Sequence, residues 1–213
     1  MKFHFDIIGK LPNKLYLACS GGMDSMVFYH FLLQGKRDII CLYFNHGTFH
    51  GRHAESFLRA AVGPLKCGNI TSEMPVGCSK EDFWRKCRYE FFSKFNDRPI
   101  ITCHHLNDQM ETFYQGLAHG DLGRLIPYKR GGGSLGPLYI RPFLNVPKSL
   151  IKMYADRHSV NYIDDPSNLN FDFTRNRIRH KVIPELLKVN PGLFKSFTKL
   201  CNDCYYGKAN IKS

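Results

Sequence analysis

One short segment, Ser20 to Ser25, limits most strongly what this chain can fold into. It reads Ser-Gly-Gly-Met-Asp-Ser. The apolar residues 14–19 before it predict a buried strand, and residues 23–34 predict a helix that begins within it. A strand that turns through small residues into a helix presents backbone N–H groups at a helix N-terminus, where phosphate binds well. The segment therefore predicts a phosphate-binding turn in an α/β fold.

The residue types within the segment support binding of a nucleotide. Gly21 and Gly22 let the backbone approach an anion closely. Ser20 and Ser25 add hydroxyl donors, and Asp24 either orders the turn or holds a magnesium ion. The Gly-Lys-Ser/Thr of a Walker A loop is missing, so this is a different kind of phosphate loop. The predicted nucleotide-binding residues here are Ser20, Gly21, Gly22, Met23, Asp24 and Ser25.

Candidate strands and helices alternate along the chain, which predicts an α/β fold with a parallel sheet of about five strands and helices on both faces. The strands are expected near residues 14–19, 38–44, 69–74, 99–103 and 138–142, and the helices near 23–34, 52–62, 80–95, 107–118, 147–158 and 193–206. Strand patterns stop after about residue 160. We therefore expect a catalytic domain over residues 1–160 and a helical C-terminal extension with a basic segment over 161–213.

Composition predicts a soluble, cytoplasmic protein with a phosphate-rich partner. The chain has 213 residues with 43% hydrophobic content, and no stretch has the length of a membrane span. Its net charge of +12 favours nucleic acid, although a merely basic enzyme is the alternative. The eight cysteines are expected to be reduced. Cys201 and Cys204 form a C-x-x-C pair without a second pair at zinc-ribbon spacing, which argues against a metal site.

A second cluster of candidate catalytic residues, His104 to Thr112, follows the predicted strand 99–103. His104 and His105 stand at the strand end, on the same sheet edge as the phosphate loop. Asp108 and Glu111 share one polar helical face, which predicts a site for magnesium or an ammonium group. Asp24 and Asp108 are the candidate magnesium ligands.

Two basic groups are the remaining candidates for binding. Arg85 and Arg88 share a helix face, and their spacing fits either a surface pairing or contacts to ATP or an RNA phosphate. A later run of cations follows an acidic turn, Asp164-Asp165-Pro166-Ser167-Asn168, and is predicted to bind an anion such as the RNA backbone. Its candidate RNA-binding residues are Arg175, Arg177, Arg179 and Lys181.

Over roughly residues 14–192 the chain resembles the tRNA(Ile)-lysidine synthases, a family of the PP-loop ATP pyrophosphatases. The matching elements are Ser20–Ser25, Asn45-His46-Gly47, Glu81 with Arg85, Arg88 and Tyr89, His104–Thr112, Arg141-Pro142, Asp165–Asn168 and Arg175–Arg179. The chain departs from the family pattern at Asn45, at Asp82 and Trp84, where the family has alanines, and at His119. Many members continue into C-terminal tRNA-binding domains, so the resemblance is to a short form that lacks them.

The resemblance implies a two-step reaction on the wobble cytidine of tRNA(Ile) with a CAU anticodon. ATP adenylates the cytosine O2 and releases pyrophosphate, and the side-chain amine of free L-lysine then attacks C2 and expels AMP. It implies ATP contacts for His46, Arg85 and Arg88, and catalytic roles for Asp108, Glu111, His104 and His105. At pH 7 only about one lysine amine in 2,500 is neutral, a barrier of roughly 4–5 kcal/mol, so a carboxylate that takes its proton is needed.

Two other functions stay open from the sequence. A PP-loop tRNA thiolase would replace the same base oxygen with sulfur, and Cys201 and Cys204 are its candidate cysteines. A non-catalytic tRNA- or nucleotide-binding relative is the other alternative, against which the carboxylates of Asp24, Asp108 and Glu111 speak. A homodimer is one way in which a short form gains further tRNA contacts.

Overall fold

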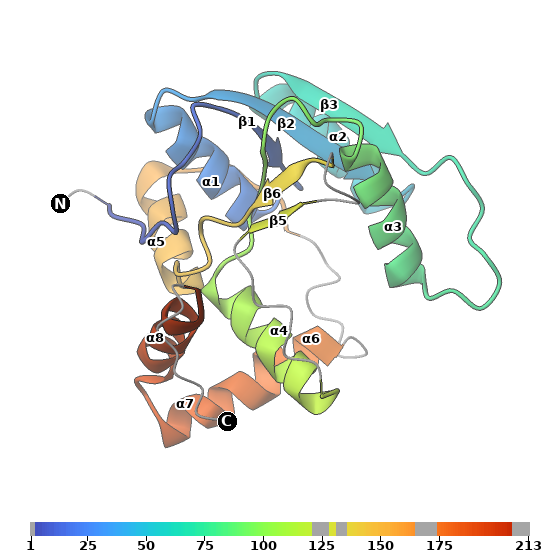
Figure 1. Cartoon of the computed structure of the whole chain (residues 1–213). Helices are drawn as coiled ribbons and strands as arrows, with labels where there is room; N and C mark the ends of the chain where they lie inside the picture. Colours follow the sequence, from blue (N-terminus) through green and yellow to red (C-terminus); the bar gives the residue numbers. More distant parts are fainter. Residues whose placement is uncertain (1–2, 121–127, 131–135, 165–173, 206–213) are drawn as a thin grey trace.

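The computed structural model describes residues 3–120, 128–130, 136–164 and 174–205. In this part of the chain, the centre of the molecule is one six-stranded sheet in the order β3-β2-β1-β4-β6-β5 (Figure 1). The strands are β1 (Lys14–Ala18), β2 (Asp38–Asn45), β3 (Leu65–Asn69), β4 (Ile100–Thr102), β5 (Tyr128–Arg130) and β6 (Leu138–Ile140). Neighbouring strands pair in parallel except β5, which is antiparallel to β6. The predicted parallel sheet of about five strands is confirmed, with β5 as an addition.

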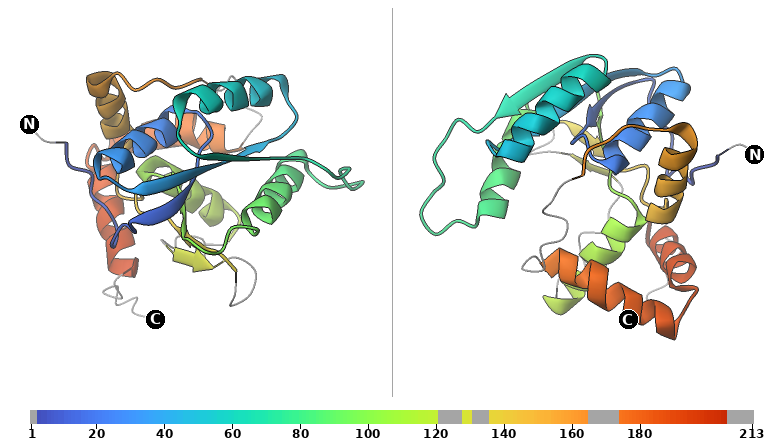
Figure 2. Two further views of the ribbon diagram at one scale, coloured as in Figure 1. Left: turned by 90° about the horizontal axis from the view of Figure 1, so that it is seen from above. Right: turned by 180° about the vertical axis from the view of Figure 1, so that it is seen from behind.

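Helices cover both faces of the sheet, as Figure 2 shows from two further directions. Since side chains alternate along a strand, Leu15 and Leu17 of β1 join a core cluster with Phe28 of α1 (Met23–Gln34), Leu58 of α2 (Phe49–Ala61) and Ile151 of α5 (Lys148–His158). Tyr16 points to the other face, where it joins Phe83, Cys87 and Phe91 of α3 (Lys80–Phe92). The helices on both faces are thereby confirmed.

The strand order places a ligand-binding position between β1 and β4. From β1 the chain moves outward through β2 to β3, and then returns to place β4 on the opposite side of β1. Leu17 pairs with Ile101, and Ala18 with Thr102, so the two strands end side by side. Open α/β sheets bind ligands where the strand order reverses, beyond the carboxyl ends of the strands. The segments that follow β1 and β4 carry the predicted phosphate loop and the paired histidines.

A third apolar cluster joins the C-terminal helices to α4 (Leu106–Ala118). Met110 of α4 is fully buried against Ile178, Ile183 and Phe197, which lie in the π-helical turn η2 (Ile178–Val182), α7 (Ile183–Val189) and α8 (Leu193–Tyr205). A short helix, α6 (Thr174–Arg177), leads directly into η2. In Figure 1 these helices lie together at one end of the molecule, away from the sheet. The C-terminal helices thus pack on α4, which carries the acidic pair.

The position of the third strand differs from the prediction. It was predicted at 69–74, but it spans Leu65–Asn69, because the pairing of β3 to β2 begins at Leu65 and ends at Asn69. Residues 128–130 form β5, where the sequence predicts no strand, and Pro147 is the N-cap of α5.

No helix in the described part of the chain has both the length and the apolarity that a membrane crossing requires.

Candidate active site

The loop after β1 has the geometry of an anion-binding turn. Gly21 has φ +82°, a left-handed conformation that favours glycine. Gly22 is the N-cap of α1, and it has no side-chain oxygen to occupy the first N–H groups of that helix. Ser25 is buried, donates its hydroxyl to the Gly22 carbonyl at 2.9 Å and accepts from the Ser20 N–H at 3.2 Å. These hydrogen bonds hold the turn in shape with the N-terminus of α1 open to a phosphate.

His105 connects the phosphate loop to the helix that carries the acidic pair. It is the N-cap of α4 and forms a reciprocal cap with Asp108: its ring Nδ1 accepts from the Asp108 N–H at 3.4 Å, and the Asp108 carboxylate accepts from the His105 N–H at 3.0 Å. Its Nε2 lies 3.6 Å from Oδ2 of Asp24 and 3.5 Å from Oδ2 of Asp108. Burial alone would lower the pKa of His105, but the two carboxylates raise it above the ordinary value.

Asp24 also meets a residue that sequence reasoning missed. Lys148, the first residue of α5, donates its ammonium to Oδ1 of Asp24. Burial opposes the charged form of Asp24, yet His105 and Lys148 outweigh it and lower the pKa of Asp24 to about 2. The position of Lys148 in the sequence could have indicated its role. It follows β6, and that strand is parallel to β4 and β1, so all three strands end at the same edge of the sheet.

The fully buried carboxylate of Glu111 is paired with two arginines whose side chains are partly exposed. Arg179 donates Nε to Oε1 at 2.6 Å and Nη2 to Oε2 at 3.1 Å, and Arg175 adds an ion pair at 3.7 Å. Arg179 also lies 3.6 Å from Oδ1 of Asp108. Burial raises the pKa of Glu111 despite the arginines, whereas the pKa of Asp108 is lowered, because the histidines and the His105 N–H outweigh its burial. The pKa values of the two carboxylates are therefore shifted in opposite directions.

The arrangement of Asp24 and Asp108 is compatible with magnesium. Both carboxylates lie beside the same His105 nitrogen, and Mg²⁺ is usually held by one or two carboxylates together with substrate phosphates. The described residues contain no group of three or more His, Cys, Asp or Glu side chains arranged to hold a metal by themselves. Any magnesium here would therefore need the phosphates as partners.

A cationic cavity of about 220 Å³ adjoins the acidic pair. Its lining is His46, Trp84, Arg85, Arg88, Tyr89, His104, Arg141 and Arg175. The rings of His46 and Trp84 are stacked, with centroids 4.8 Å apart. Burial, together with nearby arginines, lowers the pKa of both His46 and His104 to about 4, so both rings are neutral at pH 7. His104 instead shares a 2.9 Å hydrogen bond with the Thr102 hydroxyl.

The depressed pKa of His46 predicts an acid-dependent loss of stability. Its folded pKa of about 4 lies below the unfolded value, so unfolding takes up a proton between about pH 6.5 and 4. We expect the free energy of unfolding to fall by about 1–3 kcal/mol over this range, allowing for the partial exposure of the ring. Urea unfolding at pH 7 and pH 4.5 measures it. His46→Gln should remove part of the fall, and an identical fall in the variant would contradict the assignment.

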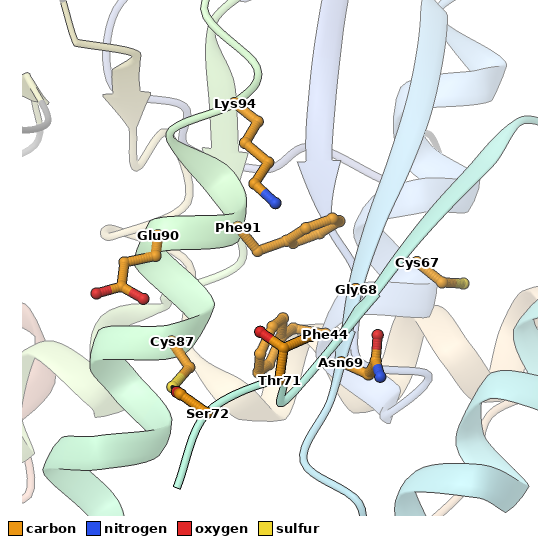
Figure 3. A pocket seen from close by; sticks show the side chains of 10 residues that line it. All are labelled: Phe44, Cys67, Gly68, Asn69, Thr71, Ser72, Cys87, Glu90, Phe91 and Lys94. Carbon is orange, nitrogen blue, oxygen red and sulfur yellow. The ribbon is translucent and has the colours of Figure 1, made fainter. Parts of the chain in front are cut away.

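A larger cavity, of about 300 Å³, lies away from these groups, between the end of β3 and α3. Figure 3 shows the Phe91 ring lying against Gly68, where an added Cβ would come within 2.4 Å of the ring. No residue of the phosphate loop and neither Asp108 nor Glu111 is among its described lining. We therefore place the candidate site at the ends of β1 and β4 and not in the larger cavity.

The structure divides the predicted site residues into three groups. The phosphate loop, His105 and Asp108 meet around Asp24. His46, Arg85, Arg88 and His104 line the cationic cavity. Arg175 and Arg179 bond to α4, whereas Arg177 and Lys181 are exposed. The acidic turn at 165–168 lies outside the described residues.

The two cysteines that the sequence offers as candidates for a thiolase, Cys201 and Cys204, are not among the residues around Asp24 or the lining of the cationic cavity. Cys201 is buried in the apolar cluster of α4 and α8, and Cys204 is exposed on α8. Cys19 and Cys41 lie in the core, and Cys103 donates its thiol to the Ala18 carbonyl at 3.6 Å.

Comparison with known proteins gives the same fold and a consistent set of relatives. The chain is 33% identical over 208 residues to the tRNA(Ile)-lysidine synthase of Bacillus subtilis (strain 168), covering 87% of this chain and 43% of that one. It is 29% identical over 223 residues to the enzyme of the same name from Legionella pneumophila (strain Paris), covering 94% and 48%. The chain thus spans about half the length of these curated relatives.

Among solved structures, the U34-tRNA thiolase NcsA from Methanococcus maripaludis with its [4Fe-4S] cluster matches with a TM-score of 0.70 at 17% identity, covering 92% of this chain and 72% of that one. At this identity the match shows the fold alone. The sequence model of the PP-loop domain family matches residues 4–186. With a phosphate loop after β1 and a match over most of its length, the chain belongs to the PP-loop domain family.

Proposed function

We propose that this chain catalyses lysidine formation on the wobble cytidine of tRNA(Ile) with a CAU anticodon, using ATP and free L-lysine. One observation carries the proposal: an open helix N-terminus for phosphate, at α1, lies near two carboxylates whose pKa values are shifted in opposite directions, Asp108 and Glu111. The similarity to enzymes named tRNA(Ile)-lysidine synthase supports it.

In the first step the cytosine O2 attacks the α-phosphorus of ATP, an O–P bond forms, and pyrophosphate leaves. The phosphates are expected at Ser20–Ser25, where backbone N–H groups stabilise negative charge without reorganising. Lys148 supplies positive charge next to Asp24, and the Nε2 of His105 lies 3.6 Å from the same carboxylate. A bound Mg²⁺ on Asp24 and Asp108 would neutralise phosphate charge. The step depends mainly on positioning, so rigid hydrogen bonds within the loop favour it.

In the second step the ε-amine of lysine attacks C2 of the adenylated base, a C–N bond forms, and AMP leaves with the C2–O bond broken. The ammonium must first lose a proton. Glu111 is the better acceptor, because burial raises its pKa above the ordinary value of a glutamate. Asp108 stays charged and holds the ammonium in place. Glu111 keeps an oxygen that can accept a hydrogen bond from Arg179 whether or not its carboxyl group is protonated.

The basic segment is proposed to contact the RNA backbone. Arg177 and Lys181 are exposed on the helix that packs against α4, so they are better placed for phosphate contacts than Arg175 and Arg179, whose side chains turn to α4. Each phosphate contact should add to the salt dependence of binding.

Incubation with a tRNA(Ile) CAU transcript, ATP, magnesium and labelled lysine tests the proposal. We expect label to enter the transcript only when ATP is present, with one AMP released per lysine. A matched transcript with uridine in place of the wobble cytidine should take up none. If no label enters and lysine does not stimulate AMP release, the proposed reaction is wrong; ATP-dependent uptake of sulfur instead would favour the thiolase.

A further inference from the structure

The cationic cavity beside the acidic pair has a composition that the proposed chemistry does not account for. An aromatic wall, Trp84 stacked on His46, faces arginines from three separate parts of the chain: Arg85 and Arg88 on α3, Arg141 after β6, and Arg175 on α6. Aromatic rings flanked by arginines are the usual surroundings of an unpaired base and its phosphate.

A polar atom in the cavity lining supports a ligand there. Within the described residues, Nδ1 of His46 is buried without a hydrogen-bond partner, whereas Nε of Arg175, which also makes no hydrogen bond, has the Glu111 carboxylate 3.7 Å away. Buried polar groups are nearly always hydrogen-bonded, so the His46 nitrogen at a cavity wall indicates a partner that enters from outside. In a neutral ring this nitrogen is a donor in one tautomer and an acceptor in the other, so it matches a ligand that carries both kinds of group, as a nucleotide does.

The size and position of the cavity favour a nucleotide of an RNA chain over ATP. At about 220 Å³ it is smaller than the roughly 300–1,000 Å³ of pockets that enclose drug-sized ligands. None of Ser20–Ser25 is among its described lining residues. An ATP molecule held by that loop would therefore have its phosphates outside this cavity. Arg175 connects the cavity to the exposed Arg177 and Lys181, which continue the positive surface outward.

We propose that this cavity binds one unpaired nucleotide of the RNA substrate, with its base stacked on the Trp84–His46 wall and its phosphate held by Arg85 and Arg88. This inference rests on the RNA substrate of the proposed function but not on the lysine chemistry. It assigns to RNA three residues, His46, Arg85 and Arg88, that sequence reasoning assigned to ATP. Lys80, whose ammonium lies 4.7 Å above the Trp84 ring, is exposed and can move aside for a base.

Trp84 is the single tryptophan of the chain, so its fluorescence reports on the cavity directly. The experiment titrates the protein with a five-nucleotide single-stranded RNA, without ATP or lysine, and follows tryptophan emission. We expect saturable quenching, and no quenching by ATP alone at concentrations that fill the phosphate loop. The same RNA with its central base removed should quench much less, because stacking needs the base.

Affinity measurements with labelled RNA complete the test. Trp84→Ala should weaken binding by about 5- to 150-fold, and Trp84→Phe, which keeps an aromatic face, by much less. Phe49→Ala is the control, since Phe49 is a large exposed side chain on α2 that does not line the cavity. Thermal unfolding of each variant checks that it is folded.

The outcomes separate this inference from the proposed function. Quenching and a Trp84→Ala defect without lysine incorporation leave the nucleotide site standing and overturn only the reaction. The nucleotide site alone is overturned if the unaltered protein incorporates lysine and Trp84→Ala binds RNA with unchanged affinity. It is also overturned if lysine is incorporated and bound RNA leaves the tryptophan emission unaltered. Full quenching by ATP would assign the cavity to ATP and would overturn the nucleotide site. A failure of the RNA to bind at low salt would overturn it as well.

Discussion

Replacing Glu111 with glutamine is expected to slow lysine transfer to RNA by about 10²–10⁴-fold, the usual contribution of a positioned proton acceptor. Glutamine keeps the shape of the side chain and an oxygen for Arg179, but it cannot take a proton from the lysine ammonium. Adenylation of the base needs no such acceptor, so pyrophosphate release in a single turnover should change little. The measurement is pyrophosphate release and label incorporation from the same reaction.

Glu185→Gln is the matched control for this substitution. Glu185 pairs with Lys188 on α7, and both side chains are largely exposed, so its loss should alter neither signal. Equal losses of pyrophosphate and lysine incorporation in Glu111→Gln would instead place Glu111 in ATP binding or in folding.

Replacing Arg179 with methionine is expected to lower the free energy of unfolding by about 3–5 kcal/mol. The carboxylate of Glu111 is fully buried, and Arg179 supplies two of its hydrogen bonds, so the variant leaves a buried charge without its main partner. Lys188→Met removes an ion pair of similar length at the surface and should cost at most about 1 kcal/mol. Urea unfolding at pH 7 compares the two.

The double variant Arg179→Met/Glu111→Gln sharpens this comparison. It removes both charges, so it should recover part of the stability that Arg179→Met loses. Two outcomes would contradict this account of the ion pair. One is a loss of unfolding free energy in Arg179→Met no larger than that in Lys188→Met. The other is a loss in the double variant equal to the sum of the losses in the two single variants.

Local patterns were sufficient for the phosphate loop and for much of the sheet. The small residues of Ser20–Ser25 require a turn between an apolar strand and an apolar helix, and β1 and α1 form there. Strand 69–74 was misplaced because Ile70 and Thr71 have high strand propensity, whereas the pairing that decides the matter runs from Leu65 to Asn69. Propensity is local, and register against a neighbouring strand is not.

The contacts within the site required the tertiary structure. Arg179 was expected to bind RNA because a run of cations favours a solvated or anion-binding surface, but its position across α4 makes Glu111 its partner. Asp24 and Lys148 are 124 positions apart in sequence, and only the meeting of strand ends at one sheet edge brings them together. Sequence spacing identifies which residues share a helix face, and it contains no information about which face of another element they meet.

The π-helical turn at Ile178–Val182 makes the fold of the basic segment sensitive to chain length as well as to the identity of Arg179. Since α6, η2 and α7 run on without a break, the i→i+5 turn inserts one residue into an otherwise regular helix. This insertion lets Arg179 face Glu111 while Ile183 remains in the apolar cluster. Deleting one residue there would rotate Arg179 by about 100° relative to α7. Replacing exposed side chains in this stretch should therefore leave the fold unchanged, whereas gaining or losing one residue would separate the arginine from its carboxylate.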